Sequence, residues 1–128
     1  MKITSFNPLI VTKDAAPIIE LFEALGFERR HTISATAGGG PKPSVDTTNV
    51  RMKNDGGFYV DISEVDAVPQ DLTLIRMNVR DFDEAYDFLL AHGFTHQSGR
   101  VVETETNKSA MLTSPSGYAF DLCQHIRK

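Results

Sequence analysis

Apolar residues recur at helical spacing in two stretches of the chain, which predicts helices from Asp14 to about Leu25 and from Asp81 to about Ala91. Each stretch begins at an aspartate, a residue type that caps the first turn of a helix. Each is followed by a glycine, as is common after the last turn. The predicted buried faces are Ile18, Leu21, Phe22 and Leu25 in the first helix, and Ala85, Phe88 and Leu89 in the second.

Strand-like segments surround both helices in the same order. They are expected at about 3–11, 27–36, 45–53, 57–63, 72–79, 94–102, 108–113 and 118–125. Two of the expected strands, 57–63 and 118–125, also begin alike. An aspartate lies four residues after Gly57 in the first and four residues after Gly117 in the second. The pattern therefore predicts an α+β fold of two βαβββ modules, about 1–64 and about 71–128, within a single domain of residues 1–128.

Composition and charge exclude several classes of protein. The 128 residues carry a net charge of −4, and they contain no basic cluster that would suit a nucleic acid. No apolar run approaches the length of a membrane span, and no signal peptide is evident, so we expect no membrane partner and a cytoplasmic location. The single cysteine, Cys123, cannot form an internal disulfide, and a small buried thiol is the favoured interpretation.

Paired βαβββ modules of this size resemble the vicinal oxygen chelate superfamily, which includes glyoxalase I, bleomycin-resistance proteins and extradiol dioxygenases. The segment Ser114-Pro-Ser-Gly-Tyr-Ala-Phe-Asp121-Leu is similar to the family ending Asp-Pro-Asp-Gly-x-x-x-Glu-Leu, and Leu-Gly-Phe at 25–27 is a second shared feature. The resemblance implies a curved mixed sheet around a cavity, with the helices on the outer face. It also implies a homodimer, since dimers are common in this superfamily.

The resemblance further suggests where a divalent metal would bind. In metal-dependent members four strand residues, usually His, Gln or Glu, hold the ion, and the corresponding positions here are Phe6, Asp61, Leu74 and Asp121. Phe and Leu have no donor atom, and two carboxylates alone would need waters to complete the shell of Mg²⁺ or Ca²⁺. His31, His92, His96 and His125 occupy none of the four positions. We therefore expect no metal and no other cofactor.

Alternation along the strands predicts which residues face the cavity. In the first strand Phe6, Pro8 and Ile10 are expected to face inward, although a slip of one residue would place Asn7 there instead. Arg76 lies on the inward face two residues after Leu74, and one hypothesis is that its guanidinium bridges Asp61 and Asp121. The alternative is that the two carboxylates lie near the mouths of the cavity and are hydrated. The expected ligand-binding residues are Phe6, Tyr59, Asp61, Leu74, Arg76, Asn78, Met111, Asp121 and Cys123.

Three functions are compatible with these residues. The favoured one is a metal-independent protein of the glyoxalase and bleomycin-resistance type that binds a small amphiphilic or aromatic molecule. The alternative is a glyoxalase-like lyase or isomerase, in which Asp61 and Asp121 move protons with a divalent metal or with Arg76 as electrostatic stabiliser. The third is a structural or regulatory domain whose cavity is vestigial.

Overall fold

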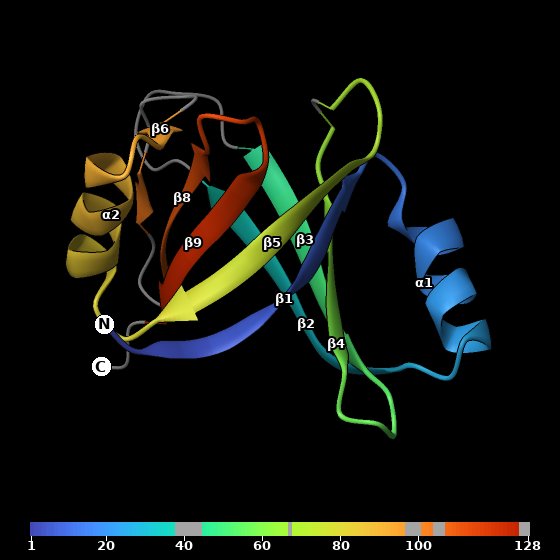
Figure 1. Ribbon diagram of the computed structural model, residues 1–128. Coiled ribbons are helices and arrows are strands. Elements are labelled where there is room, and N and C mark those ends of the chain that lie inside the picture. The colour runs from blue at the N-terminus through green and yellow to red at the C-terminus, as the bar shows by residue number, and fades with distance from the viewer. Residues whose placement is uncertain (38–44, 67, 97–100, 104–106, 126–128) are drawn as a thin grey trace. The chain divides into compact units, whose positions relative to one another are not determined.

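The computed structural model describes residues 1–128 except 38–44, 67, 97–100, 104–106 and 126–128 (Figure 1). The chain divides into two compact units. One is continuous, Asn7–Thr73, and is called here the N-terminal unit. The other combines Met1–Phe6 with Leu74–Lys128 and is called the C-terminal unit. The two units are described separately.

The N-terminal unit packs one helix on a four-stranded arrangement. It contains most of β1 (Ile3–Thr12), α1 (Ala15–Ala24), β2 (Glu28–Ala37), β3 (Val45–Lys53) and β4 (Tyr59–Glu64). β2, β3 and β4 are antiparallel neighbours, and β1 runs parallel to β4. The core lies between the helix and the sheet, and it is formed by Ala15, Ile19, Val50, Met52, Val60 and Ile62.

The C-terminal unit repeats this arrangement. It contains most of β5 (Leu72–Val79), α2 (Phe82–Ala91), β6 (Thr95–His96), β7 (Val102–Glu103), β8 (Asn107–Thr113) and β9 (Ala119–His125), together with the first residues of β1. β5 runs parallel to β9, and β8 is antiparallel to β9. The core is formed by Met77, Val79, Phe82, Ala85, Leu89, Ala110, Leu112 and Leu122.

Corresponding turns and caps use the same chemistry in both units. Asp14 and Asp81 accept hydrogen bonds from backbone amides in the first turns of α1 and α2, as predicted. The turn glycines, Gly57 and Gly117, have φ values of 85° and 108°, a left-handed conformation that residues with a side chain rarely adopt. The repeat inferred from the sequence is therefore a repeat in structure, and the α+β fold with parallel and antiparallel strand pairs is confirmed.

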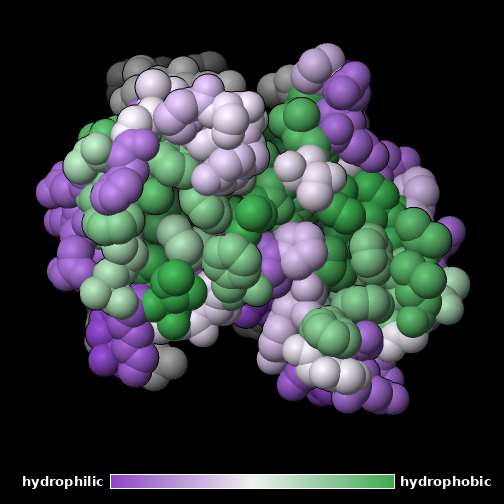
Figure 2. Space-filling view, in the orientation of Figure 1, coloured by the Kyte–Doolittle hydropathy of each residue, from purple (hydrophilic) through white to green (hydrophobic). Residues whose placement is uncertain are grey.

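The predicted helix faces are only partly correct. In α1 the buried residues are Ala15 and Ile19, whereas Leu21 and Leu25 are exposed, so that apolar surface is visible on α1 in Figure 2. Of the face predicted for α2, Phe88 is exposed. The buried or partly buried positions are 15, 18, 19 and 22 in α1 and 82, 85, 86 and 89 in α2. Both sets have the predicted helical spacing, but they start at the first residue of each helix.

The predicted strand 94–102 is wrong as one continuous strand. β6 pairs with β8 through Thr95 and Thr113. Continuing that register would set Val102 opposite residue 106, whereas Val102 pairs with Ser109. The two short strands therefore use different registers on β8, and residues 97–100 between them lie outside the described part of the chain, as do residues 38–44 between β2 and β3. Within the described residues, neither helix is long and apolar enough to cross a membrane.

Candidate functional site

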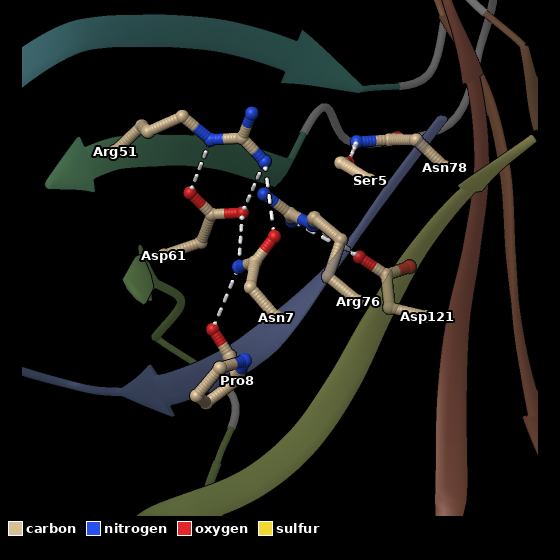
Figure 3. A network of polar contacts seen from close by, with 8 residues as sticks. All are labelled: Ser5, Asn7, Pro8, Arg51, Asp61, Arg76, Asn78 and Asp121. Carbon is tan, nitrogen blue, oxygen red and sulfur yellow. Dashed lines mark hydrogen bonds and ion pairs between the residues drawn. The ribbon is translucent and has the colours of Figure 1, made fainter. Parts of the chain in front are cut away.

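The carboxylate of Asp61 is the centre of a polar network in the N-terminal unit (Figure 3). Its side chain is 1% exposed and receives hydrogen bonds on both oxygens. Arg51 Nε donates to Oδ1 over 2.9 Å, and Arg51 Nη2 donates to Oδ2 over 3.0 Å. Asn7 Nδ2 also donates to Oδ2, over 3.0 Å, while Asn7 Oδ1 accepts from Arg51 Nη2. The burial of this charge is therefore compensated within the unit by a guanidinium and an amide.

Strand register explains how these side chains meet. In the parallel pair of β1 and β4, Leu9 lies opposite Asp61. In the antiparallel pair of β3 and β4, Arg51 lies opposite the same aspartate. Since Asn7 and Leu9 are two residues apart, they share one face of β1, and that face carries Asp61 and Arg51 as well.

The prediction that Phe6, Pro8 and Ile10 share the face of Asp61 is wrong. Ile10 lies opposite Ile62 and packs on the helix side of the sheet, which leaves Asn7 on the face of Asp61. Phe6 is 57% exposed, and its ring centroid lies 6.3 Å from that of Phe120 in the C-terminal unit, to which Phe6 belongs. The one-residue slip that the sequence left open is the register that the structure has.

A signal in the sequence could have placed Asn7 correctly. The helix caps and the glycines after the helices are each 67 residues apart, Asp14 from Asp81 and Gly26 from Gly93. The same offset matches Asn7 with Leu74, whereas matching Phe6 with Leu74 requires an offset of 68 residues. Helix ends are the better markers, because their capping chemistry ties them to one backbone position.

Arg76 and Asp121 form the corresponding ion pair of the C-terminal unit. They lie opposite each other in the parallel pair of β5 and β9. Arg76 Nε and Arg76 Nη2 both contact Asp121 Oδ2 at 3.0 Å, and the two side chains are 17% and 18% exposed. The predicted contact of Arg76 with Asp121 is thus confirmed. Its contact with Asp61, which belongs to the other unit, stays a prediction.

The two units place their arginines on different strands. Arg51 reaches Asp61 from β3, where the equivalent position of the C-terminal unit, opposite Asp121, is Met111. Arg76 reaches Asp121 from β5, where the equivalent residue opposite Asp61 is Leu9. On the two strands that flank it in its own unit, each aspartate therefore lies opposite an arginine on one side and an apolar residue on the other, and the order is reversed between the units. Reasoning from the sequence missed Arg51, although its alternation with Val50 and Met52 already indicated a polar face.

The other expected ligand-binding residues lie on these faces or next to them. Asn78 and Cys123 are buried and lie opposite each other in β5 and β9. Asn78 Nδ2 donates to Ser5 Oγ, and Asn78 Oδ1 is a buried acceptor with no partner in the structure. In the N-terminal unit the Tyr59 ring has two cations beside it, Arg51 at 5.1 Å and Lys53 at 5.2 Å from its centroid.

His92 and His96, both in the C-terminal unit, make contacts of another kind. His96 Nδ1 lies 3.0 Å from the hydroxyl of Tyr86, and His92 Nδ1 lies 2.8 Å from the carbonyl of Phe88. Within the described residues, no group of three or more His, Cys, Asp or Glu side chains is arranged to hold a metal ion.

Solved structures share this architecture. A mutant of glyoxalase I from Zea mays superposes with a TM-score of 0.65 at 16% identity over 98% of this chain, which spans 44% of the maize chain. This match covers the whole repeat of helices and strands. The chain has the vicinal oxygen chelate fold.

Two further structures show the same fold over nearly their full length. A glyoxalase/bleomycin resistance protein/dioxygenase superfamily member from Vibrio splendidus 12B01 has a TM-score of 0.58 at 20% identity, over 96% of this chain and 99% of its own. A protein from Staphylococcus aureus has a TM-score of 0.54 at 12% identity, over 97% and 98%. No protein-family model and no curated protein matches the sequence.

The residues at the metal positions of the vicinal oxygen chelate fold do not fit a divalent ion. With the corrected register these positions are Asn7, Asp61, Leu74 and Asp121. Leu74 has no donor atom, and the oxygens of Asn7 and Asp61 are already bonded to Arg51. Asp121 is likewise paired with a guanidinium. A metal would have to displace or approach these positive charges, which Coulomb repulsion opposes.

Proposed function

We propose that this protein is a metal-independent member of the glyoxalase and bleomycin-resistance type that binds a small amphiphilic or aromatic molecule. In each unit the proposed binding face is the sheet face that carries the aspartate, Asp61 in the N-terminal unit and Asp121 in the C-terminal unit. The observation that supports this proposal is that each aspartate is neutralised by an arginine of its own unit. The fold and the two ion pairs together favour binding without Lewis-acid chemistry.

The side chains on these faces suit an amphiphilic ligand. In the N-terminal unit, the polar groups of Asn7 and Arg51 lie on the same face as the apolar side chain of Leu9. In the C-terminal unit, Arg76 and Met111 lie on either side of Asp121. Binding sites for small molecules commonly combine a mostly apolar lining with a few polar groups that orient the ligand. Tyr59, with Arg51 and Lys53 at its ring, adds an aromatic surface for a ring-containing ligand.

The proposed independence from metal is tested by titrating the purified protein with Ni²⁺ and Zn²⁺ and measuring bound metal by mass spectrometry. The same samples are assayed for turnover of methylglyoxal with glutathione. We expect neither stoichiometric metal nor turnover. Stoichiometric metal with metal-dependent turnover would overturn the proposal in favour of the lyase or isomerase.

A variant designed from the internal repeat provides the matched control. Arg51→Met and Arg76→Leu give each position the residue that its equivalent already has, Met111 and Leu9. Without the guanidiniums, the oxygens of Asn7, Asp61 and Asp121 become available, and we expect the double variant to bind Ni²⁺ at least about tenfold more tightly than the natural protein. Equal Ni²⁺ affinity in a folded double variant would show that the arginines do not exclude the metal.

A further inference from the structure

One sheet face of the C-terminal unit is organised in rows across three strands. Arg76, Asp121 and Met111 lie side by side on β5, β9 and β8, as the strand registers show. Two residues further along β5 and β9, and thus about 7 Å away, the next row contains Asn78 and Cys123. The first row is charged and apolar, whereas the second consists of smaller polar side chains.

Two oxygen acceptors on this face have no donor within the described part of the chain. Arg76 Nε and Arg76 Nη2 both contact Asp121 Oδ2, and Asp121 Oδ1 receives no hydrogen bond from a described residue. Figure 3 shows this second oxygen on the side of the carboxylate away from Arg76. The other acceptor is Asn78 Oδ1, which has no partner although Asn78 is only 4% exposed.

The chemistry of these atoms restricts what can satisfy them. An ionised carboxylate and an amide oxygen accept hydrogen bonds and cannot donate them. A buried acceptor without a donor costs stability, so native structures supply one from protein, water or ligand. The NH₂ group of Asn78 donates to Ser5, which leaves the amide oxygen as the acceptor that needs a donor. A ligand that replaces water on this face must therefore bring donors of its own.

We infer that the C-terminal unit binds the hydroxyl or N–H end of an amphiphilic molecule. The donor goes directly to Asp121 Oδ1, and a second hydroxyl or a water held by the ligand satisfies Asn78 Oδ1. Met111, beside Asp121, contacts the apolar end. This inference rests on the proposed function and adds the class of ligand: an amphiphile that donates hydrogen bonds, rather than one that only accepts them.

The test compares two probes that differ in one donor. 3-Phenylpropan-1-ol and its methyl ether are titrated into ¹⁵N-labelled protein, and dissociation constants are taken from the backbone amide shifts of β5, β8 and β9. Hydrogen bonds to charged groups are the stronger ones, so we expect the alcohol to bind about tenfold more tightly than the ether, with Kd values in the millimolar range.

Asp121→Asn tests the acceptor itself. In this variant the amide oxygen keeps the contact with Arg76, so the NH₂ group takes the place of Asp121 Oδ1. Both probes can accept a hydrogen bond from that group, and we therefore expect the ratio of the alcohol and ether affinities to fall to about one. Asp87→Asn makes the same change of charge at an exposed position of α2 and should leave the ratio unchanged. The amide spectrum of each variant verifies that it is folded.

The outcomes separate this inference from the proposed function. Equal affinities of alcohol and ether for the natural protein would refute the inference while leaving small-molecule binding intact. A preference for the ether, which can only accept hydrogen bonds, would mean that Asn78 presents its nitrogen to the ligand instead of its oxygen. That result would also refute the inference. If neither probe shifts the amides of β5, β8 and β9, both the inference and the proposed function fail.

Discussion

Replacing Arg51 by Met tests whether the buried carboxylate of Asp61 depends on its guanidinium. Arg51 supplies hydrogen bonds to both oxygens of a side chain that is 1% exposed. Methionine keeps an unbranched apolar stem, and Met111 shows that it is compatible with the equivalent place on β8. The substitution therefore removes the charge with little change in packing.

The magnitude follows from the burial of the partner that is left behind. Removing one member of a buried ion pair costs about 3–5 kcal/mol. Asn7 still donates to Asp61 after the change, so we expect the free energy of unfolding to fall by a value near the lower limit, about 3 kcal/mol. Arg76→Leu should cost only about 1 kcal/mol, because Asp121 is more exposed and water can replace the lost contacts.

The assay is urea unfolding followed by circular dichroism, with linear extrapolation to water. A cycle with Asp61→Asn isolates the pair from the contact of Arg51 with the Tyr59 ring. We expect the double variant to be more stable than the sum of the single changes predicts, by at least about 1 kcal/mol. Additive changes, or an Arg51→Met that costs no more than Arg76→Leu, would refute the reasoning.

Three further predictions follow from burial, backbone conformation and charge. Asn7→Leu should lower the free energy of unfolding by about 2 kcal/mol, because Asn7 is buried and bonded to a carboxylate. Phe6→Leu should lower it by less than about 1 kcal/mol, because Phe6 is mostly exposed. Thermal melts that reverse this order would contradict the register given for β1. Gly93→Ala should cost about 1–2 kcal/mol by the same assay, since φ is 90° and an added Cβ would lie 3.0 Å from a proline ring; a stability equal to that of the natural protein would be the contrary result. The hydrogen bond from Lys108 to Asp83 raises the pKa of Lys108. The contribution of this pair to stability is therefore present below the pKa that Lys108 has in the unfolded chain, and it is lost as the pH rises through the pKa of the folded protein. Asp83→Asn should lower the pKa of Lys108 in an NMR titration, and an unchanged value would refute the assignment.

The sequence predicted the repeated architecture because its markers are local. Asp14 and Asp81 cap their helices through backbone amides within the same turn. Gly57 and Gly117 adopt conformations that depend on the glycine itself. Such signals need no information about distant segments, and so the amino-acid sequence alone is enough to locate the helix ends, the turns and the two modules.

The faces of the first strand and the partners of the aspartates were decided only in the tertiary structure. Alternation in β1 is weak, because Asn7 interrupts an apolar series, and both registers give a plausible core face. The structure has the register in which Asn7 meets Asp61, since losing a donor to a buried carboxylate costs more than exposing Phe6. Arg51 is 10 residues from Asp61 along the chain, and only the pairing of β3 with β4 sets them opposite each other.

By itself, the sequence determined where the two helices begin and end, that the elements repeat, and that two aspartates occupy equivalent places in the repeat. The tertiary structure decided which cation each aspartate receives, from β3 in one unit and from β5 in the other. The physical reason is the range of the interactions. Capping and turn conformation act within a few residues, whereas compensation of a buried charge depends on whichever strands the fold places alongside it.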